Sequence, residues 1–250
     1  MRILGVIPAR YASSRLPAKA LKIIAGKTMI QRVYEQANKA KKISDVAIAT
    51  DHSSIYNTAK DFGCKKVLMT SANHKNGTER CNEVIHLLNT EYDYVVNIQG
   101  DEPFVQPEQL DLLCSLLNGK TELATLVAPI TEEAALFSNS VMKVVFDKNN
   151  EALYFSRECV PHLRDVPKQE WIAKGTFYKH VAIYAYRTDI LNEIADLPVT
   201  PLEKSESLEQ LRWLENGYRM KIGITDFESM SVDTPNDLEK AIKFAEKHKI

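Results

Sequence analysis

The chain has 250 residues, of which 44% are hydrophobic and 26% are charged, and its formal net charge is −1. This length is sufficient for a full globular core, and the balanced charge, without long runs of lysine or arginine, argues against nucleic acid or a membrane surface as a partner. The four cysteines form no Cys-x-x-Cys pair, which argues against a zinc site or a disulfide framework and indicates free thiols in a reducing, cytoplasmic setting.

The first half of the chain alternates short apolar runs with segments of helical spacing. The run Ile3–Pro8 is too short for a signal peptide or a membrane span, so we expect the first buried strand of a soluble protein. Further strands are predicted at 46–50, 67–69 and 94–98, and helices at 28–40, 53–62 and 79–89. This alternation predicts an α/β fold, an open and mostly parallel sheet with helices on both faces.

The second half of the chain has a more mixed pattern. Strands are predicted at 141–147 and 181–187, and helices at 107–118, 188–197, 203–215 and 234–247. The stretch 158–178 contains two prolines and a glycine among charged residues without a clear period, which predicts a long loop or flap. Because no linker is evident, we expect one domain over residues 1–250, with a substrate-facing subregion in the second half.

A cation-rich loop follows the first predicted strand, where an open parallel sheet binds its ligands. The segment 8–19 carries Arg10, Arg15 and Lys19, together with the hydroxyls of Ser13 and Ser14. Guanidinium, ammonium and hydroxyl groups are what a triphosphate needs, although the segment lacks the glycine and lysine pattern of a P-loop. From the residues alone, a triphosphate site and a solvated basic loop are about equally supported.

Two acidic residues stand at positions suited to a magnesium ion. Asp101 follows the apolar strand 94–98 beside a glycine, and Asp233 precedes the last predicted helix. Carboxylates at such places commonly hold Mg²⁺. The alternative for both is a local role, since Asp233 or Thr234 also suits the cap of a helix that has Pro235 in its first turn.

The remaining candidates are polar residues whose grouping the sequence does not explain. The segment 74–80 is a polar loop entering a helix; Thr78 is a possible cap, and the loop has groups that could read a nucleobase edge. Further candidates in the second half are Arg157, His180, Tyr184, Glu209 and Gln210. A single histidine that begins a strand, as His180 does, is more often structural than catalytic.

Taken together, these segments resemble the 3-deoxy-manno-octulosonate cytidylyltransferase family, or CMP-Kdo synthetases. The matching segments occur in the family's order over nearly the whole chain: IPARYASSRLPAK, ATD, NGTER, VVNIQGDEP, MKVVFD, LYFSR, HVAIYAYR, LEQLR and VDTP. The resemblance implies a single-domain, Rossmann-like nucleotidyltransferase fold and a homodimer. It also implies transfer of CMP from CTP to an acidic 3-deoxy sugar with Mg²⁺, for lipopolysaccharide or related glycan synthesis.

The resemblance also implies a role for each candidate residue. Three groups would bind the triphosphate, namely Arg10, Ser13 and Lys19, and Arg10 and Lys19 would also act in catalysis. The cytidine would lie along Thr78, Arg80 and Gln99, and Asp101 and Asp233 would be catalytic metal ligands. The sugar acid would be bound by Arg15, Arg157, His180, Tyr184, Glu209 and Gln210.

The chain departs from the family pattern at one loop. The family usually reads Pro-Gly-Lys-Pro where this chain has Pro17-Ala18-Lys19-Ala20. A glycine permits backbone conformations that alanine tolerates poorly, so this substitution bears on the contact of Lys19 with the triphosphate. Open alternatives are therefore a modified sugar acid such as an amino-substituted octulosonate, a sialic acid, another nucleotide such as UTP or GTP with a sugar 1-phosphate, and a non-catalytic nucleotide-binding homologue.

Overall fold

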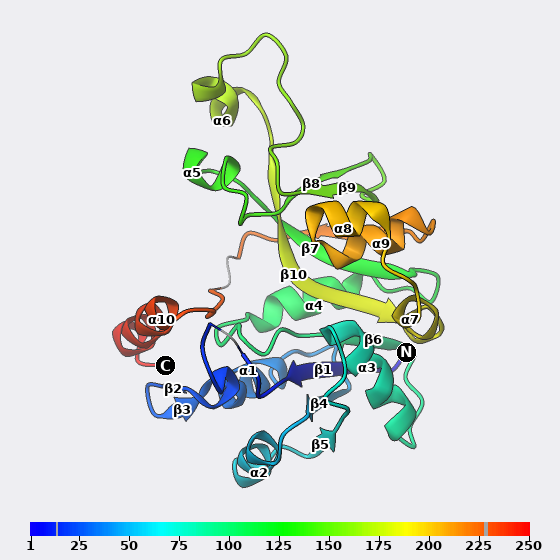
Figure 1. The fold of residues 1–250 in the computed structure, drawn as a ribbon, viewed down its shortest axis with the longest axis vertical. Coiled ribbons are helices and arrows are strands. Elements are labelled where there is room, and N and C mark those ends of the chain that lie inside the picture. The colour runs from blue at the N-terminus through cyan, green and yellow to red at the C-terminus, as the bar shows by residue number, and fades with distance from the viewer. Residues whose placement is uncertain (14, 228–229) are drawn as a thin grey trace. The chain divides into compact units, whose positions relative to one another are not determined.

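The computed structural model describes residues 1–13, 15–227 and 230–250, shown in Figure 1. Ser14, part of the predicted triphosphate loop, lies outside the described residues. The chain divides into two compact units, unit 1 with Met1–Cys114 and Ser229–Ile250, and unit 2 with Ser115–Glu228. Each unit is described by itself, and the single domain expected from the sequence stays a prediction.

Unit 1 is built on a parallel sheet in which the strand order is β6, β1, β4, β5. The strands are β1 Ile3–Ala9, β4 Asp45–Thr50, β5 Lys66–Met69 and β6 Tyr94–Asn97. β1, β4 and β6 are buried almost throughout, because a parallel strand covered on both faces needs apolar side chains on both, whereas in the edge strand β5 only Val67 is buried. The predicted strands 46–50, 67–69 and 94–98 are thus confirmed within a residue or so of their ends.

Helices connect these parallel strands. They are α1 Met29–Ala37, α2 Ser53–Asp61 and α3 Gly77–Leu87, followed by α4 Pro107–Ser115. Because crossover connections are right-handed, α1 and α2, which lead from β1 out to β5, lie on one face, and α3, which returns to β6, lies on the other. The order in which strands join the sheet therefore reverses between β1 and β6, which lie side by side in parallel (Figure 1), and such switch points are where open α/β sheets bind ligands.

The C-terminal helix α10, Pro235–His248, belongs to unit 1. Its buried face packs with the loop that follows β1 and with the short hairpin of β2 Ile23–Ile24 and β3 Lys27–Thr28. Their shared apolar cluster contains Leu16, Ile24, Met29, Phe104, Val232, Ala241 and Ala245. This cluster anchors both the loop of Lys19, where the 3-10 helix η1 Lys19–Leu21 begins, and the segment of Asp233.

Unit 2 has a mixed set of strands. They are β7 Leu123–Pro129, β8 Lys143–Phe146, β9 Ala152–Ser156, β10 Tyr178–Arg187 and β11 Met220–Ile224. β7 pairs antiparallel with β10 and parallel with β11, while β8 pairs antiparallel with both β9 and β10. The predicted strands 141–147 and 181–187 are confirmed, whereas β7 and β11 were not expected.

The helices of unit 2 differ from the prediction in two places. They are α5 Glu133–Leu136, α6 Trp171–Lys174, α7 Thr188–Ala195, α8 Pro201–Glu206 and α9 Glu209–Glu215, with the 3-10 helix η2 Lys168–Glu170. The predicted helix 203–215 is wrong in its continuity, because Ser207 has a left-handed backbone (φ 52°) that ends α8. The predicted loop 158–178 contains α6, which Figure 1 shows beyond the start of β10, and Trp171 and Phe177 in it are buried with Ile130 and Leu136.

The predicted class, an α/β fold with a mostly parallel sheet, is confirmed, and unit 1 shows it most clearly. Among the described residues, every helix is too short or too polar to cross a membrane.

Candidate active site

A polar cavity of about 380 Å³ opens at the switch point of unit 1. It is lined by Pro8, Ala9, Arg10, Ser13, Arg15, Lys19, Ala20, His74, Lys75, Asn76, Gly77, Arg80, Gln99, Gly100, Asp101 and Asp233. These residues come from the ends of β1 and β6, the loop before α3 and the segment before α10. The lining has more cationic than anionic side chains, which suits a polyanionic ligand.

Two glycines allow the segments around this cavity to approach closely. A Cβ added to Gly100 would lie 2.8 Å from the carbonyl oxygen of Pro8, which no side chain could tolerate without a backbone shift. A Cβ added to Gly77 would lie 3.0 Å from the side-chain nitrogen of Asn97. The turn that carries Asp101 and the start of α3 are therefore held against the ends of β1 and β6.

Lys19 brings the two predicted metal ligands together. Its ammonium lies 2.5 Å from Oδ2 of Asp101 and 2.8 Å from Oδ1 of Asp233, and Nη2 of Arg15 lies 3.0 Å from the same Asp233 oxygen. Residues separated by 82 and 214 positions thus meet at one nitrogen. The structure places the predicted residues Arg10, Ser13, Arg15, Lys19, Arg80, Gln99, Asp101 and Asp233 around one cavity.

Backbone contacts fix the positions of the two aspartates. The N–H of Val232 donates to the carbonyl of Asp101 at 2.9 Å, which joins the two acidic segments directly. Thr234 and Asp237 form a reciprocal capping box at the start of α10, and Pro235 occupies its first turn. Thr234 is therefore the cap, and the side chain of Asp233 remains available to the cavity.

The charge on Lys19 is set by two opposing effects. Burial lowers the pKa of its ammonium, but the charges and hydrogen bonds of Asp101 and Asp233 together raise that pKa more, so that it lies above its ordinary value. Lys19 is accordingly a cation at neutral pH. It offsets the mutual repulsion of two carboxylates whose side chains are 26% and 32% exposed.

The two aspartates fit a magnesium ion. Oxygens of both lie within hydrogen-bond distance of a single nitrogen, so they are close enough for one small cation to contact both. Among the described residues there is no group of three or more histidine, cysteine, aspartate or glutamate side chains suited to a metal. A pair of carboxylates completed by phosphate and water oxygens is nevertheless the usual donor set for Mg²⁺.

Ala18 has the backbone conformation that a glycine would favour. Its φ and ψ are 51° and 40°, in the left-handed region, and Leu21 N donates to its carbonyl at 2.9 Å to close η1. An alanine in this region costs on the order of 1 kcal/mol. Ala18 thus has the left-handed conformation expected of a glycine at this position, at the cost of local backbone strain, and the loop directs Lys19 to the two aspartates.

The loop before α3 forms another wall of the cavity. Asn76 caps this helix by accepting the N–H of Glu79 at 2.8 Å, so the predicted cap at Thr78 is wrong. Asparagine and threonine both suit the capping position, so the sequence did not distinguish Asn76 from Thr78; α3 begins at Gly77, which makes Asn76 the cap. Thr78 is 1% exposed and is not among the residues that line the cavity in the described part of the chain, and its contact with a nucleotide stays a prediction.

Arg80 is buried, and its guanidinium is held by two partners. It donates to the hydroxyl of Thr70 at 2.5 Å and to Oδ2 of Asp51 at 3.2 Å. Asp51 also accepts the backbone N–H of Tyr11 at 3.0 Å, which ties the loop after β1 to α3. Asp51 belongs to the ATD segment, but its role as a connector was not foreseen, because the pairing depends on residues far apart in the sequence.

In unit 2 the structure brings His180, Tyr184 and Glu209 together, and Gln210 follows Glu209 on α9. The ring centroids of His180 and Tyr184 lie 5.1 Å apart, and Tyr184 meets Trp213 of α9 edge to face at 5.3 Å. Burial raises the pKa of the Tyr184 hydroxyl, and the negative charge of Glu209 raises that pKa further. Burial lowers the pKa of His180 to about 3, so the ring is neutral. Among the described residues, His180 Nδ1, Gln210 Nε2 and Trp213 Nε1 are buried without a hydrogen-bond partner. Buried polar atoms of this kind are uncommon and favour a ligand or water as partner.

Arg157 is placed in unit 2 by backbone contacts. Its guanidinium donates to the carbonyls of Glu206 at 2.6 Å, Asn139 at 3.1 Å and Ser207 at 3.3 Å. Its own carbonyl accepts the buried ammonium of Lys143. Arg157 therefore braces three chain segments, and since a guanidinium has five N–H groups, it retains donors for a carboxylate.

A cation-rich cavity at the switch point of a parallel sheet, with two carboxylates at its edge, defines a nucleotide-binding α/β enzyme. The chain belongs to the cytidylyltransferase family, whose model matches residues 4–224. The resemblance inferred from the motifs is thus confirmed, and the chain is a nucleotidyltransferase.

Curated relatives and a solved structure agree with this family. The chain is 51% identical over 248 residues to a 3-deoxy-manno-octulosonate cytidylyltransferase of Bacteroides thetaiotaomicron, with 98% of each chain covered. It is 49% identical over 249 residues to the Parabacteroides distasonis protein of the same name, again with 98% of each covered. A solved structure of CMP:2-keto-3-deoxy-manno-octonic acid synthetase complexed with CTP is 38% identical, with a TM-score of 0.92, and the match covers 99% of this chain and 100% of that one.

Proposed function

We propose that this protein transfers CMP from CTP to the anomeric hydroxyl of 3-deoxy-D-manno-octulosonate, releasing pyrophosphate. The product would be CMP-Kdo, for lipopolysaccharide or a related glycan. The observation that supports this most is the meeting of Lys19, Asp101 and Asp233 at a cation-rich cavity, in a chain about half identical to relatives that carry this name.

The proposed reaction is a single displacement at phosphorus. The C2 hydroxyl of the sugar acid forms a new bond to the α-phosphorus of CTP while the bond to the bridging oxygen breaks, and the hydroxyl proton is lost to solvent. Such transfers depend mainly on positioning and charge neutralisation. Arg10 and Lys19, both on the cavity wall, would stabilise the negative charge that develops on pyrophosphate, and Ser13 would hold a phosphate oxygen.

We propose Asp101 and Asp233 as the ligands of a magnesium ion. When bound, the ion supplies positive charge to the phosphates and lowers the pKa of a coordinated hydroxyl. The two aspartates also orient Lys19, because its ammonium contacts both. The nearby guanidinium of Arg15 adds charge beside Asp233 and is 66% exposed, free to meet an anionic substrate.

For the nucleoside, we propose Gln99, Arg80 and Thr78. Gln99 and Arg80 line the cavity beside the loop before α3. For the sugar acid, we propose Arg157 together with the cluster of His180, Tyr184, Glu209 and Gln210 in unit 2. The supporting observations are the unpartnered polar atoms of that cluster and the free donors of Arg157.

The setting is also part of the proposal. We propose a cytoplasmic homodimer with no nucleic acid or membrane partner. The free state of all four cysteines supports a reducing compartment, and the resemblance to the family supports the dimer.

The test is pyrophosphate release by the purified protein with Mg²⁺, using CTP, UTP, ATP and GTP against a panel of acidic sugars. The panel contains Kdo, an amino-substituted octulosonate and a sialic acid. We expect turnover with CTP and Kdo, and little with the other nucleotides, because a site that pairs with one base edge rejects bases that leave its polar groups unpaired. Comparable release with UTP, or none with any acidic sugar, would contradict the proposal.

A further inference from the structure

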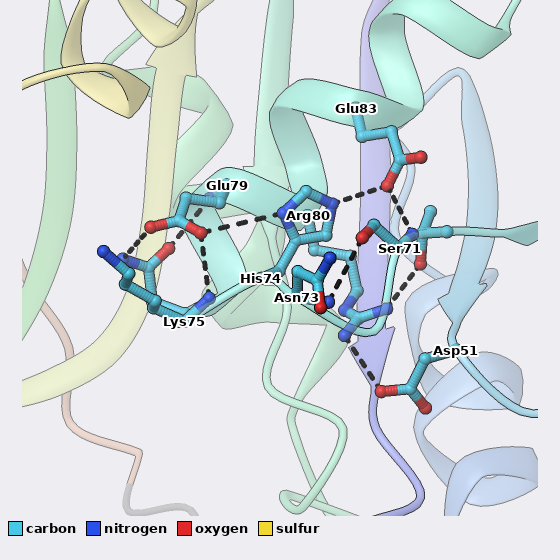
Figure 2. Close-up of polar contacts among 10 residues, drawn as sticks. Asp51, Ser71, Asn73, His74, Lys75, Glu79, Arg80 and Glu83 are labelled. Atoms are coloured by element: carbon cyan, nitrogen blue, oxygen red, sulfur yellow. Dashed lines mark hydrogen bonds and ion pairs between the residues drawn. The ribbon is translucent and has the colours of Figure 1, made fainter.

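The loop that forms one wall of the nucleotide cavity is held by two glutamates of the helix that follows it. Residues 71–76 form no regular helix or strand before α3 begins at Gly77, and His74, Lys75, Asn76 and Gly77 all line the cavity. Figure 2 shows the side chains of Glu79 and Glu83 pointing from α3 toward this loop. Its shape therefore depends on contacts made by side chains outside it.

Glu83 holds two points of the loop with one oxygen. Its Oε2 accepts the backbone N–H of Ser71 at 2.8 Å and lies 2.5 Å from Nε2 of His74 (Figure 2). Burial raises the pKa of Glu83, but the hydrogen bonds from His74 and Ser71 lower it more, so the side chain is a carboxylate at neutral pH. A charged acceptor gives stronger hydrogen bonds than a neutral one.

Glu79 holds the other end of the same loop. Its Oε2 accepts the N–H of Lys75 at 2.8 Å and lies 3.7 Å from Nδ1 of His74, and its Oε1 accepts from the side chain of Asn76 at 3.5 Å. Glu79 and Glu83 are four residues apart on one helix face, a spacing at which like charges repel. The ring of His74 lies between them, with one nitrogen toward each carboxylate (Figure 2).

This contact set is largely shielded from solvent and distinct from the phosphate side of the cavity. The side chains of His74, Glu79 and Glu83 are 18%, 22% and 29% exposed, so their interactions are screened less than those of a surface pair. The nearby guanidinium of Arg80 is directed to Thr70 and Asp51 instead. The cations assigned to the triphosphate come from the loop after β1.

We propose that Glu83, acting through His74 and the N–H of Ser71, is a positioning residue for the nucleobase. It holds loop 71–76 so that the polar groups of the loop meet one base edge, and it thereby sets the preference for cytosine over uracil. This inference rests on the proposed use of CTP. It assigns no contact with the reacting atoms to Glu83.

The experiment measures equilibrium binding of CTP, UTP and inorganic tripolyphosphate, with Mg²⁺, to the full-length protein and its Glu83→Gln and His74→Gln variants. Glu83→Gln keeps an acceptor for Ser71 but loses the charge. We expect each variant to bind CTP at least about tenfold more weakly and to lose most of the preference over UTP, while its affinity for tripolyphosphate stays within about twofold. In turnover assays the KM for CTP should rise while that for the sugar acid and kcat change little.

The matched control is His86→Gln, because His86 is an exposed histidine in the last turn of the same helix. It should leave all three affinities unchanged. A variant that still binds tripolyphosphate is folded, so a loss of affinity confined to CTP supports the positioning role. Full CTP preference in both variants, or an equal loss for CTP and tripolyphosphate, overturns it. A wild-type protein that does not distinguish CTP from UTP contradicts the proposed function itself, and the inference with it.

Discussion

The residues predicted to act on CTP and those predicted to bind the sugar acid have very different surroundings. In unit 1 the central ones, Lys19, Asp101 and Asp233, are charged and partly exposed, stand outside the strands of the sheet, and satisfy one another in ion pairs. In unit 2 most of them stand around aromatic rings; His180 and Gln210 are buried with polar atoms that have no partner among the described residues, while Arg157, Tyr184 and Glu209 are partly buried. The first arrangement suits a mobile polyanion and a metal, and the second suits selective recognition of hydroxyl groups.

The largest expected effect is that of Asp101→Asn. If Asp101 is one of two anionic metal ligands, as proposed, its loss should lower kcat on the order of a thousandfold. The pair of Asp101 with Lys19 is partly exposed, so the melting temperature should change by only a few degrees. Steady-state assays and a thermal melt check both, with Asp61→Asn at the exposed end of α2 as the control. Near-normal turnover at saturating Mg²⁺ would remove Asp101 from the site.

The variant Arg157→Lys tests the residues predicted to bind the sugar acid. Lysine cannot reach the carbonyls of Glu206, Asn139 and Ser207 together, so we expect a lower melting temperature. If the remaining donors bind the substrate carboxylate, the KM for the sugar acid should also rise at least about tenfold, while the KM for CTP changes little. A lowered melting temperature with an unchanged sugar-acid KM would leave Arg157 a purely structural residue.

His180 gives the buried cluster a defined pH dependence. Its pKa is about 3 in the folded protein because of burial, against roughly 6.5 in an unfolded chain. The unfolded state therefore binds an additional proton between these values, and the free energy of unfolding falls by about 1.4 kcal/mol per pH unit as the pH drops through that range. Denaturant unfolding at pH 7, 6 and 5 should show a shallower loss for His180→Gln than for the wild type. Parallel pH profiles would mean that the ring is protonated in the folded state.

The smallest expected effect is that of Ala18→Gly. Removing the Cβ relieves the left-handed backbone at φ 51°, which should stabilise the protein by about 0.5–1 kcal/mol and raise the melting temperature by roughly 2 °C. Ala37→Gly, at the end of α1, should have the opposite effect, because helical alanine is favoured over glycine. A lowered melting temperature for Ala18→Gly would show that the loop is unstrained.

The parts of this molecule that could be predicted from sequence are those set by local patterns. The continuous apolar runs of β1, β4 and β6 predicted buried parallel strands. The ends of β1 and β6 correctly indicated where Arg10 and Asp101 would stand. The acidic and cationic motifs therefore converged as expected.

Other features depend on contacts between distant residues and left no local signal. The break between α8 and α9 is at Ser207, a residue without a glycine's preference for positive φ. Trp171 and Phe177 showed no period in the predicted flap because they pack on Ile130 and Leu136 rather than along one helix face. The partners of Arg80 and His74, which are Asp51 and Glu83, were likewise visible only once the loops and α3 were placed together.

The central claim is that the triphosphate of CTP binds at the unit 1 cavity through Lys19. Calorimetric titration of CTP into the wild type and Lys19→Gln, at fixed Mg²⁺, tests it most directly, since glutamine removes the positive charge from a residue only 18% exposed. We predict that the variant binds CTP at least about tenfold more weakly, while its melting temperature falls by a few degrees because the two carboxylates lose their shared cation. Equal CTP affinity in the two proteins would contradict the claim.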